Sequence, residues 1–163
     1  FQELKEAVAN YCLNASEKIR SESLVAKAIT VFVRTSPFQR NYGYYSNAKI
    51  IDFPIATNNS IEIVKTAVSI LEVIFKNGYQ YQKAGVMLTG LRSDDGRKNL
   101  FSSEKDEKIN SLMRSIDNTN YRYGRSTLSL ASAGVQKRWN MKREYSSKID
   151  TADFYSLPKI KAI

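Results

Sequence analysis

The segment Tyr81-Gln82-Lys83-Ala84-Gly85-Val86-Met87-Leu88 decides the fold class of this chain. Apolar residues occupy every second position after Lys83, and this period of two is typical of a sheet strand with one buried face. The other face carries Lys83 near Gly85, where the absent side chain lets a ligand approach the backbone. We therefore expect a half-buried sheet strand here, with an anionic partner close to Lys83 and Gly85.

Patterns before this segment predict two helices and two further strands. Asn59 and Glu62 have the capping-box spacing that begins a helix, and Gly78 should end that helix in a left-handed conformation. Pro54 should close the strand before it. The predicted elements are a helix over 2–20, strands over 25–34 and 48–53, a helix from Asn59 towards Gly78, and a strand over 81–90.

The chain is basic, with 25 Lys and Arg against 16 Asp and Glu, a formal charge of +9 and a pI near 9.6. The most basic part is 121–163, which carries nine basic and three acidic residues together with Trp139 and four of the ten tyrosines. Basic residues interleaved with aromatic ones suit a nucleic acid or an acidic protein. We therefore expect an anionic macromolecule as the partner.

Several site classes are excluded by composition. Cys12 is the single cysteine and there is no histidine, so an intramolecular disulfide, the usual zinc sites and Ser-His or Cys-His catalytic pairs are ruled out. We expect Cys12 to be buried on its helix. No apolar run approaches the ~20 residues that a membrane-spanning helix needs, so no membrane partner is expected.

Blocks in one consistent order resemble the C-terminal part of Y-family translesion DNA polymerases, most closely the UmuC branch. Residues 81–88 are similar to the last strand of their little-finger domain, and Arg34-Thr35-Ser36-Pro37-Phe38 is similar to a turn after an earlier strand. Arg97-Lys98-Asn99-Leu100-Phe101 occupies the place of the sliding-clamp peptide. Gly124-Arg125-Ser126-Thr127 and Trp139-Asn140-Met141-Lys142-Arg143 resemble the C-terminal extension. Each block alone is weak, but their order is specific.

The resemblance implies an α+β fold of the two-layer little-finger type, in which an antiparallel sheet has two helices on one face. The family order begins with a further strand, which is missing here or precedes Phe1. In the extension we expect a helix over 104–120 and a short strand over 126–132. The implied parts are a DNA-binding domain (1–91), a tether with a clamp-binding peptide (92–104) and a small helix–strand extension (105–163).

The resemblance also implies that the sheet grips damaged primer–template DNA through its phosphates, without reading sequence. The implied DNA-binding residues are Lys83, Gly85, Gln82, Arg34, Thr35, Ser36 and Arg40. For the loop after Arg34, a surface turn with tyrosines folded onto the sheet is an equally good interpretation.

Two partner-binding segments follow. Arg97, Asn99, Leu100 and Phe101 would dock on the sliding clamp, because two apolar anchors on a tether suit such docking. The usual peptide begins with glutamine where this chain has Arg97. The alternative is that Leu100 and Phe101 pack on the domain.

Arg125, Trp139, Lys142 and Arg143 would form the partner-binding surface of the extension. The resemblance implies a UmuD-type accessory subunit or the recombinase filament as the partner. For Trp139 itself, the usual burial of tryptophan favours packing on the helix over 104–120.

No catalytic site is expected in this chain. Ser115-Ile116-Asp117-Asn118 is superficially like the palm motif of these polymerases, but the second carboxylate is absent. Two-metal phosphoryl transfer needs clustered carboxylates, so no metal or cofactor is expected here, and Mg²⁺ belongs to the palm of the parent. The resemblance thus implies a non-catalytic fragment of an error-prone polymerase of SOS mutagenesis in the bacterial cytoplasm. A basic α/β RNA-binding module and a purely protein-binding domain remain the alternatives.

Overall fold

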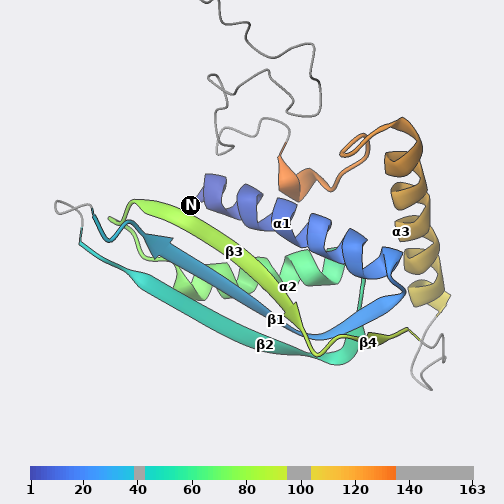
Figure 1. Ribbon diagram of the computed structural model, residues 1–163, viewed down its shortest axis with the longest axis horizontal. Coiled ribbons are helices and arrows are strands. Elements are labelled where there is room, and N and C mark those ends of the chain that lie inside the picture. The colour runs from blue at the N-terminus through green and yellow to red at the C-terminus, as the bar shows by residue number, and fades with distance from the viewer. Residues whose placement is uncertain (39–42, 95–103, 135–163) are drawn as a thin grey trace, which may run out of the picture.

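The computed structural model describes residues 1–38, 43–94 and 104–134. The predicted order of helix, strand, strand, helix and strand is confirmed, and it forms an α+β fold (Figure 1). The elements are α1 (Gln2–Ser21), β1 (Leu24–Thr35), β2 (Ser46–Thr57), α2 (Ser60–Ile74), β3 (Tyr81–Thr89), β4 (Arg92–Ser93), α3 (Glu104–Tyr123) and the 3-10 helix η1 (Ala131–Ala133).

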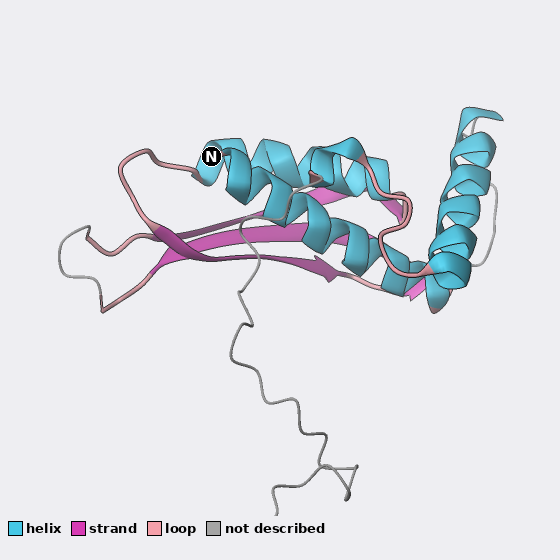
Figure 2. Ribbon diagram, turned by 90° about the horizontal axis from the view of Figure 1, so that it is seen from above, coloured by secondary structure: helices cyan, strands magenta, loops and turns pink. Residues whose placement is uncertain are grey.

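The described elements form two layers. The long strands are antiparallel in the order β2-β1-β3, and β4 pairs with the start of β1. Figure 2 shows α1 and α2 together on one face of the sheet, while the opposite face carries no described helix. This arrangement confirms the predicted little-finger-type layering. No helix within the described ranges has an apolar stretch that could cross a membrane.

The core lies between the sheet and the two helices. Ala84, Val86 and Leu88 of β3 pack against it, whereas Lys83 and Met87 are exposed, as the period of two predicted. The fully buried centre includes Val8, Cys12, Ile29, Val31, Val33, Phe53, Ile63, Ile70, Leu71 and Ile74.

The start of α2 follows the prediction and its end does not. The Asn59 side chain accepts a hydrogen bond from Ile61 N at 3.0 Å, which makes Asn59 the N-cap. In a complete capping box, the Glu62 side chain would accept a hydrogen bond from Asn59 N. Here Asn59 N donates to Thr57 Oγ1 instead, at 3.2 Å. Gly78 has the expected left-handed φ of +87°, but α2 has already ended at Ile74, so Gly78 belongs to the turn before β3.

The prediction that Pro54 closes the second strand is wrong, because β2 continues to Thr57. The register shifts here, since Ala28 pairs with Asp52 while Ala26 pairs with Thr57. A proline is tolerated in an edge strand at such an irregularity, where its missing N–H breaks no ladder bond.

The predicted strand over 126–132 is also wrong. The Asn120 side chain donates to Leu128 O at 2.9 Å and accepts from Leu128 N at 2.8 Å. A side-chain amide therefore takes the place that a neighbouring strand would have. Ser126 has a φ of +65°, and the segment ends in η1.

The first residues of the predicted tether belong to the sheet. Arg92 and Ser93 form β4 opposite Val25 and Leu24, and Asp94 N donates to Ser23 O at 2.8 Å. β3 is an edge strand of the described sheet.

Candidate nucleic-acid interface

The register of the strands determines which side chains share the helix-free face. Arg34 of β1 lies opposite Lys83 of β3, and Phe32 lies opposite Gly85. The next row joins Thr30 to Met87 on β3 and to Ile50 on β2. This face, which we call the open face, therefore has two cations at one end and larger apolar side chains at its centre.

Arg34 and Lys83 bring two positive charges together at one end of the open face. They are direct cross-strand partners, and both side chains are exposed. Within the described residues neither cation has a carboxylate partner. Like charges directly opposite each other destabilise a sheet, so an anion bound between them would relieve the repulsion.

The expected approach of an anion to the backbone of Gly85 is not what the structure shows. A Cβ added at Gly85 would lie 2.5 Å from Phe32 Cζ and 2.6 Å from Phe32 Cε1. The Phe32 ring therefore fills the space that the glycine leaves open. Gly85 therefore accommodates the aromatic ring of the neighbouring strand.

The centre of the open face is apolar. Phe32 is 40% exposed, Ile50 58% and Met87 54%, and the three lie in two adjacent rows. Sequence reasoning missed Phe32 as a site residue. The alternation along β1 indicates that Phe32 is exposed, but it does not tell which residue lies opposite. That information comes from the strand register.

Thr35 and Ser36 were expected to donate hydroxyls to a phosphate, and the structure gives them another role. Thr35 is 2% exposed, and its Oγ1 accepts from Tyr45 N at 2.9 Å. Ser36 is buried, and its Oγ accepts from Phe38 N at 3.3 Å. Both hydroxyls stabilise the turn between β1 and β2, so they do not belong to the exposed site.

An aromatic cluster occupies the same end of the sheet. Tyr45 stacks on Tyr79 with 4.9 Å between ring centroids, and its hydroxyl donates to Ile74 O at 2.7 Å. The rings of Tyr81 and Tyr45 form a T-shaped pair, and burial raises the pKa of the Tyr81 hydroxyl. For Tyr45, this supports the interpretation that the loop tyrosines fold back onto the domain.

The other predicted residues divide into two groups. Gln82 is exposed in β3 and lies in a bulge, because Arg34 pairs with Lys83 while Thr35 pairs with Tyr81. Arg125 is exposed in the turn after α3 and lines a small cavity between α1 and α3. Outside the described residues lie Arg40, Arg97, Asn99, Leu100, Phe101, Trp139, Lys142 and Arg143.

Metal ligands do not gather in the described ranges, where no group of three or more Cys, Asp or Glu side chains could hold an ion. Asp117, from the palm-like tetrapeptide, instead pairs with Arg20. Its carboxylate therefore has a structural partner.

Comparison of the sequence with known proteins assigns the chain to a family. Residues 1–100 match the family described as the impB/mucB/samB family C-terminal domain. The chain belongs to this family. A second match, to a domain of unknown function (DUF4113), covers residues 110–160.

Named relatives of the impB/mucB/samB family agree with this assignment. The chain is 36% identical over 163 residues to Protein UmuC of Salmonella typhimurium, covering 99% of this chain and 39% of the relative. It is 34% identical to Protein ImpB of Salmonella typhimurium and 31% identical to Protein MucB of Escherichia coli, covering 95% and 96% of this chain and 37% of each relative. The chain thus spans less than two-fifths of the length of these proteins.

The two family matches divide the described structure between them. The whole sheet, with the Arg34–Lys83 pair, lies in the impB/mucB/samB match, whereas most of α3 and all of η1 lie in the second match.

Proposed function

We propose that this chain is the DNA-gripping part of an error-prone translesion DNA polymerase that acts in SOS mutagenesis. The observation that carries the proposal is the Arg34–Lys83 pair. These two cations are cross-strand partners on a sheet face without described helices, and no carboxylate among the described residues pairs with them. Catalysis, with its Mg²⁺, would belong to the palm of the parent polymerase. The role of this chain would be to hold damaged primer–template DNA.

The chemistry of the open face supports contacts to the DNA backbone. Lysine and arginine neutralise phosphates and release counterions, which gives affinity without sequence preference. The net charge of +9 favours association with any polyanion. Enzymes that must accept any damaged template need this kind of contact.

Reversing the charge of Lys83 separates a binding role from a structural role. Lys83→Glu places opposite charges across β1 and β3, so the free energy of unfolding should rise by ~0.2–1 kcal/mol. Duplex affinity should fall equally for all sequences, and the slope of log K against log salt should lose about one unit, from one phosphate contact. Fluorescence anisotropy and urea unfolding measure the two effects.

Lys49→Glu is the matched control. It makes the same charge change in β2 at an exposed position that pairs with Val31 in a row of the helix-covered face. Duplex affinity that falls as much for Lys49→Glu as for Lys83→Glu would mean that only net charge matters. A salt-independent affinity of the unmodified chain would contradict the electrostatic proposal.

The apolar centre of the open face favours a second candidate, a protein partner on the same surface. Phe32, Ile50 and Met87 together offer the kind of exposed apolar area that protein interfaces use. Binding of single-stranded RNA in preference to duplex DNA would instead favour the RNA-binding alternative. Competition between duplex DNA, single-stranded RNA and candidate proteins distinguishes these possibilities.

Clamp docking by residues 97–101 is part of the proposal and rests on residue types. Truncating both Leu100 and Phe101 to Ala should abolish binding to a bacterial sliding clamp, because each anchor of this kind carries ~2 kcal/mol or more. Arg97→Gln should tighten binding by restoring the amide of the usual peptide. Phe38→Ala is the control, since Phe38 is 90% exposed in a different loop.

A clamp pull-down at low salt gives the result for these variants. If the unmodified chain does not bind the clamp, the docking proposal fails. An early thermal transition in the Leu100 and Phe101 double variant would assign these residues to the core.

The extension would bind a UmuD-type accessory subunit or the recombinase filament through Arg125, Trp139, Lys142 and Arg143. The support is the concentration of positive charge after residue 120 and the second family match over 110–160. Loss of either interaction in Lys142→Glu/Arg143→Glu, with duplex affinity retained, would support this assignment.

A further inference from the structure

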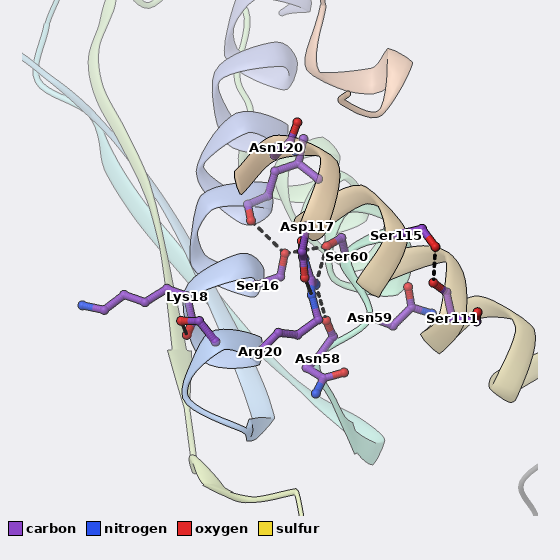
Figure 3. A network of polar contacts seen from close by, with 12 residues as sticks. Ser16, Lys18, Arg20, Asn58, Asn59, Ser60, Ser111, Ser115, Asp117 and Asn120 are labelled. Atoms are coloured by element: carbon purple, nitrogen blue, oxygen red, sulfur yellow. Dashed lines mark hydrogen bonds and ion pairs between the residues drawn. The ribbon is translucent and has the colours of Figure 1, made fainter. Parts of the chain in front are cut away.

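Helix α1 has a second contact surface besides the one that it buries against the core. Figure 3 shows Arg20, near the C-terminal end of α1, between α3 and the start of α2. Its Nε and Nη2 donate to the two carboxylate oxygens of Asp117 at 2.6 and 2.8 Å. Its Nη1 donates to Asn58 O and to Ser60 Oγ, both at 2.7 Å. One guanidinium therefore joins three segments that are far apart in the sequence.

The environment of this pair makes it stronger than an ordinary surface ion pair. The Arg20 and Asp117 side chains are 11% and 24% exposed. Ser60 is buried, and its hydroxyl also shares a 2.7 Å hydrogen bond with Ser16 of α1. Bidentate, charge-assisted bonds in a partly desolvated site fix geometry as well as adding free energy.

Within the described residues, α3 buries little of its surface. Met113 is the single buried side chain of α3 within the described residues, whereas Leu112, Tyr121 and Tyr123 are exposed. The segment after α3 has its own attachment, in which Asn10 Nδ2 donates to Ala133 O at 2.6 Å. Among the described residues, the Arg20–Asp117 pair and the burial of Met113 are therefore prominent attachments of α3.

We propose that the Arg20–Asp117 pair is a latch that holds α3 in one orientation against the sheet domain, and that α3 swings away when the pair is broken. The latch joins the two family matches, because Arg20 lies within 1–100 and Asp117 within 110–160. It would set the direction in which the extension is presented relative to the open face. The proposal rests on this geometry and does not depend on DNA binding.

Asp117→Ala tests the latch without weakening the helix itself. Alanine has the higher helix propensity, so loss of α3 protection in this variant has to come from undocking. Asn118→Ala is the matched control, because Asn118 is exposed, adjacent on the same helix, and subject to a similar change in propensity. Amide hydrogen exchange of the intact chain, resolved by segment, is the first readout.

A distance measurement is the second readout. Spin labels at Lys108→Cys on α3 and Lys49→Cys on β2 report the orientation of the helix, and the buried Cys12 should stay unlabelled. We expect one narrow distance distribution in the unmodified chain and in Asn118→Ala. In Asp117→Ala we expect a broad distribution, with amide exchange in 107–123 at least tenfold faster and exchange in α1 and β1 unchanged.

Two results would overturn the proposal. One is an Asp117→Ala variant with the same narrow distribution and the same exchange as Asn118→Ala. The other is faster exchange throughout the sheet and α1, which would make Asp117 part of one cooperative core. Arg20→Ala combined with Asp117→Ala should leave α3 no freer than Arg20→Ala alone, and an additive effect would also contradict a paired latch.

Discussion

Phe32 and Gly85 are cross-strand partners on the open face, and each is explained by the other. An aromatic ring over a strand glycine covers exposed backbone and adds apolar contact, which offsets the low strand propensity of glycine. The ring lies where a Cβ at residue 85 would be, 2.5 Å from Cζ. The glycine is therefore required by packing on the open face, whatever ligand that face binds.

The effect of Gly85→Ala should depend on Phe32. In the unmodified chain the new Cβ would displace the ring, and we expect a loss of ~1 kcal/mol in the free energy of unfolding. In a Phe32→Leu background the same change should be neutral or stabilising by ~0.5 kcal/mol, because alanine has less entropy to lose than glycine. Urea unfolding of the four proteins measures the coupling. Equal losses in both backgrounds would refute the packing explanation.

The buried Cys12 thiol should make the free energy of unfolding fall at alkaline pH. Burial raises the pKa of its thiol from 9.0 to about 12. The unfolded chain releases this proton above pH 9 and the folded chain retains it, so the contribution to stability is complete below pH 9 and is lost as the pH rises towards 12. The free energy of unfolding of the unmodified chain should therefore fall relative to Cys12→Ala, by about 1.4 kcal/mol per pH unit.

Denaturant titrations of both proteins between pH 8 and pH 10.5 give this difference. Parallel pH profiles would mean that the thiol is not desolvated. A thiol reagent should also leave Cys12 unmodified until the protein unfolds, since the side chain is fully buried.

At the scale of elements, the first backbone groups of α2 are hydrogen-bonded both by the N-cap residue and by residues around it. Asn59 satisfies the amide of Ile61, while Thr57 satisfies the amide of Asn59. Arg20 binds the carbonyl of Asn58 just before the helix. The start of α2 is therefore stabilised mainly by groups outside its first turn.

Asn59→Ala should lower the free energy of unfolding by ~1 kcal/mol, the usual effect of losing an N-cap. Glu62→Ala should cost less, because the Asn59 amide that a capping-box glutamate would bind already has Thr57 as its acceptor. Thermal unfolding followed by circular dichroism compares the two variants. A larger loss for Glu62→Ala would mean that the capping box forms in solution.

The sequence correctly predicted those elements that are determined by residues close together in the chain. The strand at 81–88, the helix at 2–20 and the Asn59 cap depend on periodicity and on neighbouring residues. The strand expected over 126–132 failed because Asn120, outside that window, binds the backbone of Leu128. The Pro54 boundary failed because a proline is compatible with an irregular edge strand.

The candidate site was predicted only in part, for the same reason. Lys83 and Arg34 were identified as cations, but their pairing depends on the register between two strands that are distant in the sequence. The role of Thr35 changed because the turn brings Tyr45 to its hydroxyl. The Arg20–Asp117 pair spans 97 positions, and no local pattern marks it.

At the scale of the whole molecule, the two faces of the sheet differ in what covers them and in their side chains. One face is covered by α1 and α2 and forms the core, and α1 in turn carries α3 through Arg20. The open face presents Arg34 and Lys83 beside an apolar centre. A ligand held on the open face would therefore lie on the opposite side of the sheet from the two core helices.

The most direct test of DNA binding by the open face is to map a bound duplex by nuclear magnetic resonance. Backbone amide shifts would be followed while an undamaged duplex is titrated into the intact chain at low salt. We predict that the largest changes lie at Phe32, Arg34, Lys83 and Met87, and that they disappear at high salt. Changes concentrated on α1 and α2, with the open face unaffected, would contradict the account.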